Sequence, residues 1–266
     1  MVKVEPICAA CLLHRGVEEA GLATQDPAVK MEVVKQLLKM LCERFTAEAV
    51  PARLGAERDR IVRRITGSTD PYREAKRRSN EEALRLLPVA ERRVEEAPPG
   101  LERFRAACLV AAAANAFEFG VLGYKFSVED AEKMLSSAEL AIDDVEEAYA
   151  YVKPGGRVLY LADNAGEIGF DRLLVEELKA NRVEVWLMVK GSPILNDALL
   201  EDAKFFKLDS LVDRLLTTPG DDVGLDLSAA TEELREAYLG ADLIIAKGMG
   251  HYETLTEHPA KPPVLH

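Results

Sequence analysis

The stretch RVLYLADNAGE, residues 157–167, is the part of the sequence that decides the fold. Its first six residues form an apolar run that predicts a buried strand. The residues that follow carry apolar side chains at the spacing of one helix face, at Ile168, Phe170, Leu173, Leu174, Val175 and Leu178. Asp163 and Asn164 therefore stand where a strand ends and a helix begins, the corner where open α/β sheets bind ligands.

Asp163 and Asn164 bring a carboxylate and a carboxamide to this corner. Their oxygens are the hard ligands that Mg²⁺ or Mn²⁺ prefers. Gly166 allows a backbone or an anion to approach closely, and the start of the helix favours negative charge. A capping aspartate in an ordinary strand-to-helix turn is the alternative, and this segment by itself does not decide between the two.

Two further segments repeat the pattern of a strand followed by glycine and a polar side chain. They are VEVWLMV-KGSPILND, residues 183–197, and DLIIA-KGMGHYE, residues 242–253. In a parallel sheet built from consecutive β-α-β units, all strand carboxyl ends lie on one edge. Asp197 and Lys247 are then expected to converge with Asp163 and Asn164. Two carboxylates and an amide make a divalent-metal site, and the lysine makes a phosphate site.

The chain divides near residue 152. Before this point helical spacing runs almost throughout, and after Pro154 strands alternate with helices, which is typical of a parallel sheet. We therefore predict an α/β fold in which a helical N-terminal region, residues 1–152, caps a mainly parallel three-layer α/β/α sheet. That sheet region, residues 153–266, is Rossmann-like, carries the metal site and packs with the helices as one unit. Residues 211–216 are expected to add a strand.

Motifs that occur in order over nearly the whole chain give it a specific resemblance. They are Cys8-Ala9-Ala10-Cys11, Asp70-Pro71-Tyr72 followed by Lys76 and Ser79-Asn80, Asn115 near Gly120, and the segments 163–167, 193–197 and 247–253. On these motifs the sequence resembles the damage-control phosphatases, also called the domain of unknown function 89 family. The Cys-x-x-Cys indicates the prokaryotic-type branch of that family.

The resemblance implies a metal-dependent phosphatase that hydrolyses small phosphorylated metabolites, such as sugar phosphates or cofactor intermediates. It implies that Asp163, Asn164 and Asp197 hold a divalent metal ion, one of Mg, Mn, Co and Ni. It also implies that Lys247 contacts the phosphate group. The expected partner is therefore a small phosphorylated metabolite.

Specific roles can be assigned to residues around this site. The expected catalytic residues are Asp163, Asp197, Lys247 and Glu253. The expected substrate- or phosphate-binding residues are Asn115, Glu118, Gly166, Glu167, Asn196, Lys247, Gly248 and Gly250. Glu253 or Glu167 is expected to orient water or a substrate hydroxyl, and the sequence does not choose between them. The helical region is expected to bring Asn115 and Glu118 over the strand ends, while the alternative is that Asn115 satisfies a buried backbone group.

Three features depart from the family pattern. Glu118 stands where the family usually has an aspartate three residues after the asparagine, and His251-Tyr252 replaces the Asn-Phe of one branch. The segment 263–266 resembles the start of a last strand that is cut short, so we expect a truncated or partial sequence.

Other mechanisms and classes of protein were weighed against this interpretation. A covalent route would use Asp163 as the nucleophile, but phosphatases of the haloacid-dehalogenase type place a second aspartate two residues on, where this chain has Ala165. We therefore favour attack by water. A nucleotide- or dinucleotide-binding protein would need Gly-x-Gly-x-x-Gly after a strand, and Gly248-Met249-Gly250 supplies only two of those glycines. A non-catalytic metal-binding protein leaves the strand-end loops unexplained.

Composition favours a cytoplasmic enzyme. The chain has 266 residues, 48% of them hydrophobic, which is enough to bury a core. Its net charge is −12 and its arginines are interleaved with acids, so the concentrated basic face of a nucleic-acid-binding protein is not expected. No apolar run approaches the ~18 residues of a membrane span, and there is no signal-peptide pattern. The oligomeric state is not predicted.

The cysteines are expected to be reduced thiols, because no secretory signal accompanies them. Cys8 and Cys11 have three possible roles: a zinc site that includes His14, a redox or incidental pair, and plain packing near the N-terminus. No second pair with the spacing of zinc ligands is present, so the sequence leaves all three open.

Overall fold

The computed structural model describes residues 2–115, 127–256 and 262–266. The helices that precede the sheet are α1 (Pro6–Ala23), α2 (Pro27–Arg44), α3 (Pro51–Thr66), α4 (Arg73–Glu95), α5 (Leu101–Ala114), α6 (Val128–Ser137) and α7 (Val145–Tyr149). The elements that follow are β1 (Arg157–Leu161), α8 (Glu167–Ala180), β2 (Glu184–Val189), α9 (Leu200–Phe205), the 3₁₀ helix η1 (Leu208–Ser210), β3 (Arg214–Thr217), α10 (Glu232–Leu239), β4 (Leu243–Ala246), α11 (Gly248–Leu255) and β5 (Val264–Leu265).

Local signals in the sequence set several helix boundaries. Proline occupies the first helical position of α1, α2 and α3, where its missing N–H leaves no bond unmade. The Asp26 carboxylate caps α2 by accepting the Ala28 N–H at 2.8 Å. Gly67, with φ +73°, closes α3 in the left-handed conformation that glycine adopts without steric cost.

The five strands form one sheet in the order β3-β2-β1-β4-β5, and every neighbouring pair is parallel. The predicted parallel sheet is therefore confirmed. Leu161 at the end of β1 is level with Met188 of β2 and with Ala246 of β4. Strands β2 and β3 lie on one side of β1, and β4 and β5 lie on the other. The direction of the connections therefore reverses between β1 and β4, and the loops that follow these two strands border the crevice where such sheets bind ligands.

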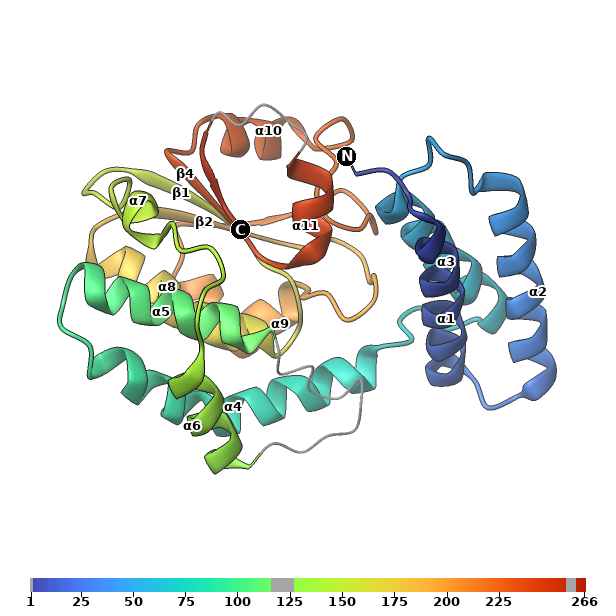
Figure 1. Ribbon diagram of the computed structural model, residues 1–266, viewed down its shortest axis with the longest axis horizontal. Helices are drawn as coiled ribbons and strands as arrows, with labels where there is room; N and C mark the ends of the chain where they lie inside the picture. Colours follow the sequence, from blue (N-terminus) through green and yellow to red (C-terminus); the bar gives the residue numbers. More distant parts are fainter. Residues whose placement is uncertain (1, 116–126, 257–261) are drawn as a thin grey trace.

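Helices cover both faces of the sheet, which makes three layers (Figure 1). Alternate residues of each inner strand contribute to opposite cores, as the two-residue repeat of a strand requires. In β1, for example, Val158 and Tyr160 join the core shared with α4, α5 and α8, while Leu159 and Leu161 join the core shared with α10. This burial on both faces explains why the strands are continuously apolar.

Helices α1, α2 and α3 form a bundle with a hydrophobic core of its own, built around Val33, Leu37 and Val62. Figure 1 shows this bundle beside the sheet, whereas α4, α5 and α6 lie beneath the sheet together with α8. Along the chain, α7 ends at Tyr149 and β1 begins at Arg157, on either side of the boundary expected near residue 152. The main core crosses it, because α4 and α5 pack directly on α8.

Two smaller expectations concern strands. Residues 211–216 were expected to add a strand, and the observed β3 covers Arg214–Thr217 and follows η1. The strand expected to begin after Pro263 is β5, which pairs with β4 through Ile244↔Val264 and Ile245↔Leu265. Across the parts of the chain that the structure describes, no helix is both long and apolar enough to cross a membrane.

Candidate active site at the carboxyl edge of the sheet

The loops that follow β1 and β2 pair with each other through their backbones. Asn164 and Asp197 form an antiparallel bridge, and the Ala198 N–H donates to the Asp163 carbonyl oxygen at 2.7 Å. This short pairing, made outside the main sheet, brings Asp163, Asn164 and Asp197 side by side. The three residues predicted to hold a metal ion are therefore neighbours in space.

Two asparagine amides connect the Asp163 carboxylate to that of Glu167. The Asn164 Nδ2 donates to Asp163 Oδ2 at 2.8 Å and to Glu167 Oε2 at 3.0 Å. The Asn115 Nδ2 approaches the same two oxygens, at 3.4 and 3.2 Å. Asn115 lies at the end of α5, so the helical part of the chain does reach this edge of the sheet.

Negative charge accumulates in this cluster. Burial raises the pKa of Asp163 well above its usual range, and the nearby carboxylates of Asp197 and Glu167 raise it further. Burial also raises the pKa of Asp197 to about 6, although the Lys190 ammonium partly offsets the effect. A bound cation would favour the ionised form of these carboxyl groups, so their crowding here indicates a place built for positive charge.

The first turn of α11 lies directly against Asp163. Gly248 has φ +81°, and a Cβ atom added to it would lie 2.5 Å from Asp163 Oδ1 and closer still to the rest of that carboxylate. Only glycine allows both this conformation and this approach. The start of α11 therefore adds its unpaired N–H groups to the edge of the site.

Lys247 is buried next to the cluster and is already paired. Its Nζ forms an ion pair with Glu167 and donates to Asp171 Oδ1 at 2.8 Å. Asp171 also accepts the Tyr160 hydroxyl at 2.7 Å. Burial by itself lowers the pKa of Lys247, but the Asp171 and Glu167 carboxylates outweigh it and keep the pKa above its usual value. The lysine is thus charged, although its direct partners are not Asp163 or Asp197.

Helix α4 supports the loop after β1 from behind. The Gly166 N–H donates to Asn80 Oδ1 at 2.7 Å, and the Asn80 Nδ2 donates to Asp202 Oδ1 at 2.7 Å. A Cβ atom at Gly166 would lie 2.9 Å from the Ser79 Cβ, so this glycine serves helix packing. The Ser79-Asn80 motif is therefore a support for the loop.

The remaining predicted site residues have no side-chain hydrogen bond or ion pair to the carboxylate cluster in the described parts of the chain. The Asn196 carbonyl accepts the Ala165 N–H at 2.9 Å, which helps to pair the two loops. Gly250 packs against the loop at Gly224, where a Cβ atom would lie 3.1 Å from the Gly224 nitrogen. The Glu253 side chain, half-buried on α11, has no hydrogen bond or ion pair to the cluster within the described ranges. Glu118 lies outside the described residues.

Two buried lysines near Asp197 were not predicted as site residues. The Lys190 Nζ lies 3.7 Å from Asp197 Oδ2 and donates to the Gly224 carbonyl at 2.5 Å. Lys190 directly follows β2, just as Lys247 follows β4, so the strand-end pattern could have identified it. Lys76 forms a buried ion pair with Asp70 at 2.7 Å, and its charge also favours the ionised form of Asp197.

The donors of the cluster suit a hard divalent cation with oxygen ligands. In the described parts of the chain, no three His, Cys, Asp or Glu side chains converge as a metal site. The predicted ligands Asp163, Asn164 and Asp197 comprise two carboxylates and one amide. The Asn164 amide presents its nitrogen to Asp163, so a metal ion here would require the amide to turn its oxygen inward.

The N-terminal thiols lie apart from this cluster, at the first turns of α1. Cys8 is half-buried, its Sγ accepts the Glu5 N–H at 3.4 Å, and Cys11 is exposed. Both are free thiols. A zinc site formed with His14 gains no support from these contacts.

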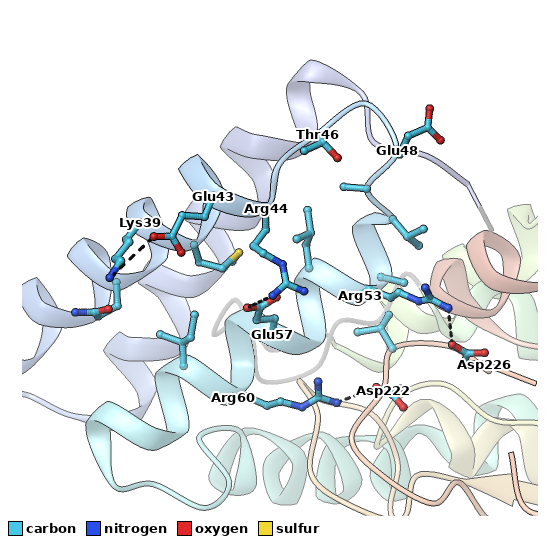
Figure 2. Close-up of a pocket in the computed structure, with 18 of the residues that line it drawn as sticks. Lys39, Glu43, Arg44, Thr46, Glu48, Arg53, Glu57, Arg60, Asp222 and Asp226 are labelled. Carbon is cyan, nitrogen blue, oxygen red and sulfur yellow. Dashed lines mark hydrogen bonds and ion pairs between the residues drawn. The ribbon is translucent and has the colours of Figure 1, made fainter. Parts of the chain in front are cut away.

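A cavity of about 870 Å³ lies between α2, α3 and the loop at residues 222–226 (Figure 2). Its lining contains none of the predicted site residues. Most of the charged side chains labelled in Figure 2 form ion pairs, for example Arg53 with Asp226 at 3.0 Å and Arg60 with Asp222 at 2.8 Å. The cavity is therefore distinct from the carboxylate cluster.

Comparisons with known proteins identify the family of this chain. The sequence model of the damage-control phosphatase ARMT1-like domain matches residues 4–266. A protein named damage-control phosphatase from Archaeoglobus fulgidus is 38% identical over 264 residues, which cover 98% of this chain and 90% of that protein. Damage-control phosphatase PH1575 from Pyrococcus horikoshii is 33% identical over 261 residues, 96% of this chain and 87% of that protein.

A solved structure extends the likeness to the fold. The crystal structure of a DUF89 family protein from Pyrococcus horikoshii superposes with a TM-score of 0.89 at 32% identity, covering 100% of this chain and 91% of that chain. The family resemblance expected from the motifs is thereby confirmed. This chain belongs to the damage-control phosphatase family, through an ARMT1-like domain that spans almost all of its length.

Proposed function

We propose that this protein is a divalent-metal-dependent phosphomonoesterase that hydrolyses small phosphorylated metabolites. Membership of the damage-control phosphatase family supports a phosphatase role. The observation that carries the metal-dependent part is the backbone pairing of two strand-end loops, which places Asp163, Asn164 and Asp197 side by side. The closeness of the Asp163 and Asp197 carboxylates supports a bound cation.

Asp163, Asn164 and Asp197 would hold the metal ion, with the Asn164 amide turned so that its oxygen faces the ion. When bound, such an ion supplies positive charge that polarises a phosphoryl group and lowers the pKa of a bound water. Binding of the ion would also relieve the repulsion between the buried carboxylates of Asp163 and Asp197.

The surrounding groups would bind and orient the substrate. The N–H groups at the start of α11, beside Asp163, are suited to bind phosphate oxygens, because a helix N-terminus favours negative charge. Lys247 lies one residue before that turn and would add its charge to the same region. A phosphate that approached Lys247 would compete with Glu167 and Asp171 for the N–H donors of its ammonium group. Phosphate binding would therefore break the ion pair between Lys247 and Glu167.

Glu167 is the better candidate of the two glutamates for orienting the attacking water. It contacts Asn164, Asn115 and Lys247, whereas the Glu253 side chain has no such contact within the described ranges. A Glu167 carboxylate freed from Lys247 would be able to accept a proton from water next to the metal ligands. We therefore assign this role to Glu167 and leave Glu253 outside the immediate site.

The test is an aryl phosphate assay on chelator-treated protein, with Mg²⁺, Mn²⁺, Co²⁺ and Ni²⁺ added back one at a time. Asp163→Asn and, separately, Asp197→Asn should each lower metal-stimulated turnover by at least about 100-fold. The matched control is Asp242→Asn, because the Asp242 carboxylate accepts the Arg157 N–H at 2.9 Å at the opposite edge of the same sheet. It should leave turnover unchanged.

Two outcomes would overturn the proposal. One is turnover in either cluster variant equal to that of wild type, with circular dichroism showing a native fold. The other is wild-type turnover that no divalent ion stimulates and no chelator removes. If neither outcome is seen, a panel of sugar phosphates, nucleotides and phosphorylated cofactor intermediates, assayed by phosphate release, will define the substrate class.

A further inference from the structure

The loop that carries Asp197 contains an unfavourable backbone conformation. Leu195, two residues before Asp197, has φ +45°, in the left-handed region that non-glycine residues rarely occupy. Such a conformation persists only where surrounding contacts hold it. Two contacts hold Leu195 in this conformation and so help to place Asp197. The first is local, because the Asp197 N–H donates to the Ile194 carbonyl oxygen at 3.1 Å and closes the turn around Leu195.

The second contact comes from the three-helix bundle. The Asp59 carboxylate of α3 accepts the Leu195 N–H through Oδ2 at 3.0 Å, across 136 residues of sequence. Asp59 is only 1% exposed, so solvent does not weaken the hydrogen bond. An ionised acceptor makes a backbone hydrogen bond shorter and stronger than a neutral one does.

Arg58 holds the other oxygen of the same carboxylate. Its Nε and Nη2 donate to Asp59 Oδ1 at 2.8 and 2.5 Å, and its side chain is 5% exposed. Helix α1 packs against the aliphatic part of the Arg58 side chain at Gly16, where a Cβ atom would lie 3.2 Å from Arg58 Cγ. Asp59 is thus fixed on one side by the bundle, and its remaining oxygen is directed to the loop.

We propose that Asp59 is a positioning residue for Asp197, so that the bundle of α1, α2 and α3 sets the geometry of the metal site through one buried carboxylate. The inference rests on the proposed function, since Asp197 is taken as a metal ligand. On this proposal the bundle helps to place a metal ligand. Asp59 restrains the loop from the bundle, while Lys190 of the sheet region faces Asp197.

The test compares Asp59→Ala with Asp221→Ala in the full-length protein. Asp221 is a suitable control because it forms ion pairs with Arg60 and Arg63 of the same helix but, among the residues that the structure describes, has no hydrogen bond or ion pair to the loop at Leu195. Both variants should lower the melting temperature. Only Asp59→Ala should speed hydrogen–deuterium exchange of the amides at residues 195–198 in metal-free protein. It should also weaken Mn²⁺ binding in calorimetry by about tenfold or more, the equivalent of one charge-assisted hydrogen bond.

A second substitution separates positioning from packing. Leu195→Gly removes the cost of the left-handed conformation, so the double variant Asp59→Ala with Leu195→Gly should recover most of the lost Mn²⁺ affinity without restoring the melting temperature. If Asp59→Ala does not fold, Asp59→Asn should show the same changes to a smaller degree, because a neutral amide is a weaker acceptor.

Asp59 has a purely structural role if its variants match Asp221→Ala in both amide exchange and Mn²⁺ affinity. The proposal is equally overturned if the double variant binds Mn²⁺ no better than Asp59→Ala. A wild-type protein that binds no divalent ion would instead overturn the proposed function. In that case the exchange comparison still decides whether Asp59 positions the loop.

Discussion

The substitution Gly248→Ala tests whether the close approach of α11 to Asp163 is required for activity. Gly248 has φ +81°, so alanine would incur the cost of a left-handed conformation, about 1–2 kcal/mol. Its methyl group would also lie 2.5 Å from Asp163 Oδ1, where ordinary van der Waals contact begins near 3.4 Å. The carboxylate or the helix must therefore retreat by about 1 Å or more.

A displacement of this size affects function more than stability. A shift of about 1 Å at a reacting group can lower turnover by about 100-fold. We therefore expect Gly248→Ala to lose about 100-fold or more in metal-stimulated aryl phosphate turnover and to bind Mn²⁺ more weakly. The loss of unfolding free energy, measured by urea denaturation, should be a few kcal/mol, which leaves the protein folded.

Gly155→Ala is the matched control. Gly155 has φ +78°, close to that of Gly248, and, in the part of the chain that the structure describes, no atom beyond its chain neighbours lies within 4 Å of an added Cβ. It carries the same conformational cost without the clash, so it should lose about 1–2 kcal/mol of stability and keep normal turnover. The reasoning is refuted if Gly248→Ala retains wild-type turnover, or if Gly155→Ala loses as much activity.

Glu19, Lys247 and the N-terminal cysteines provide three further tests. Burial and the Asp59 carboxylate raise the pKa of Glu19 from 4.5 to about 9. The folded protein therefore keeps a proton that the unfolded chain releases, and stability falls as pH rises between these values. Glu19→Gln should remove this slope, at most about 1.4 kcal/mol per pH unit, and parallel slopes in urea unfolding between pH 5 and 9 would contradict this. Lys247→Met leaves buried Asp171 without its cation and should cost about 3 kcal/mol or more, whereas an unchanged urea midpoint would argue against the ion pair. Cys8→Ser with Cys11→Ser should leave turnover unchanged, and a loss of activity in a folded protein would place the thiols in the active site.

The strand ends show what local sequence patterns specify well. Parallel strands are predicted by three apolar runs, which precede Asp163, precede Lys247 and span residues 183–189. A parallel sheet places the carboxyl ends of all three strands on one edge. The α/β fold was predictable from these segments and the family from motifs along nearly the whole chain, and both predictions are confirmed. Their information is local, because strand and helix formation depend on the periodicity of neighbouring residues.

The partners of Lys247 are an example of contacts that local sequence patterns do not predict. The sequence placed a cation at the end of β4, where it was expected to converge with Asp163 and Asp197, whereas the structure pairs it with Glu167 and Asp171. Those two residues are four apart on α8 and so share one face of that helix. Which face turns toward Lys247 depends on how α8 packs on the sheet, and that rotation is a property of the whole core.

By itself, the sequence determined the strands, the helices and the edge of the sheet where polar side chains gather. The tertiary structure alone decided which carboxylates Asn115 contacts at that edge and that Asp59 holds Leu195. On the sequence, Asp59 is one charge among many in a helix rich in arginine. Its role arises because the bundle docks against the loop of Asp197, a contact across 136 residues that no local pattern encodes.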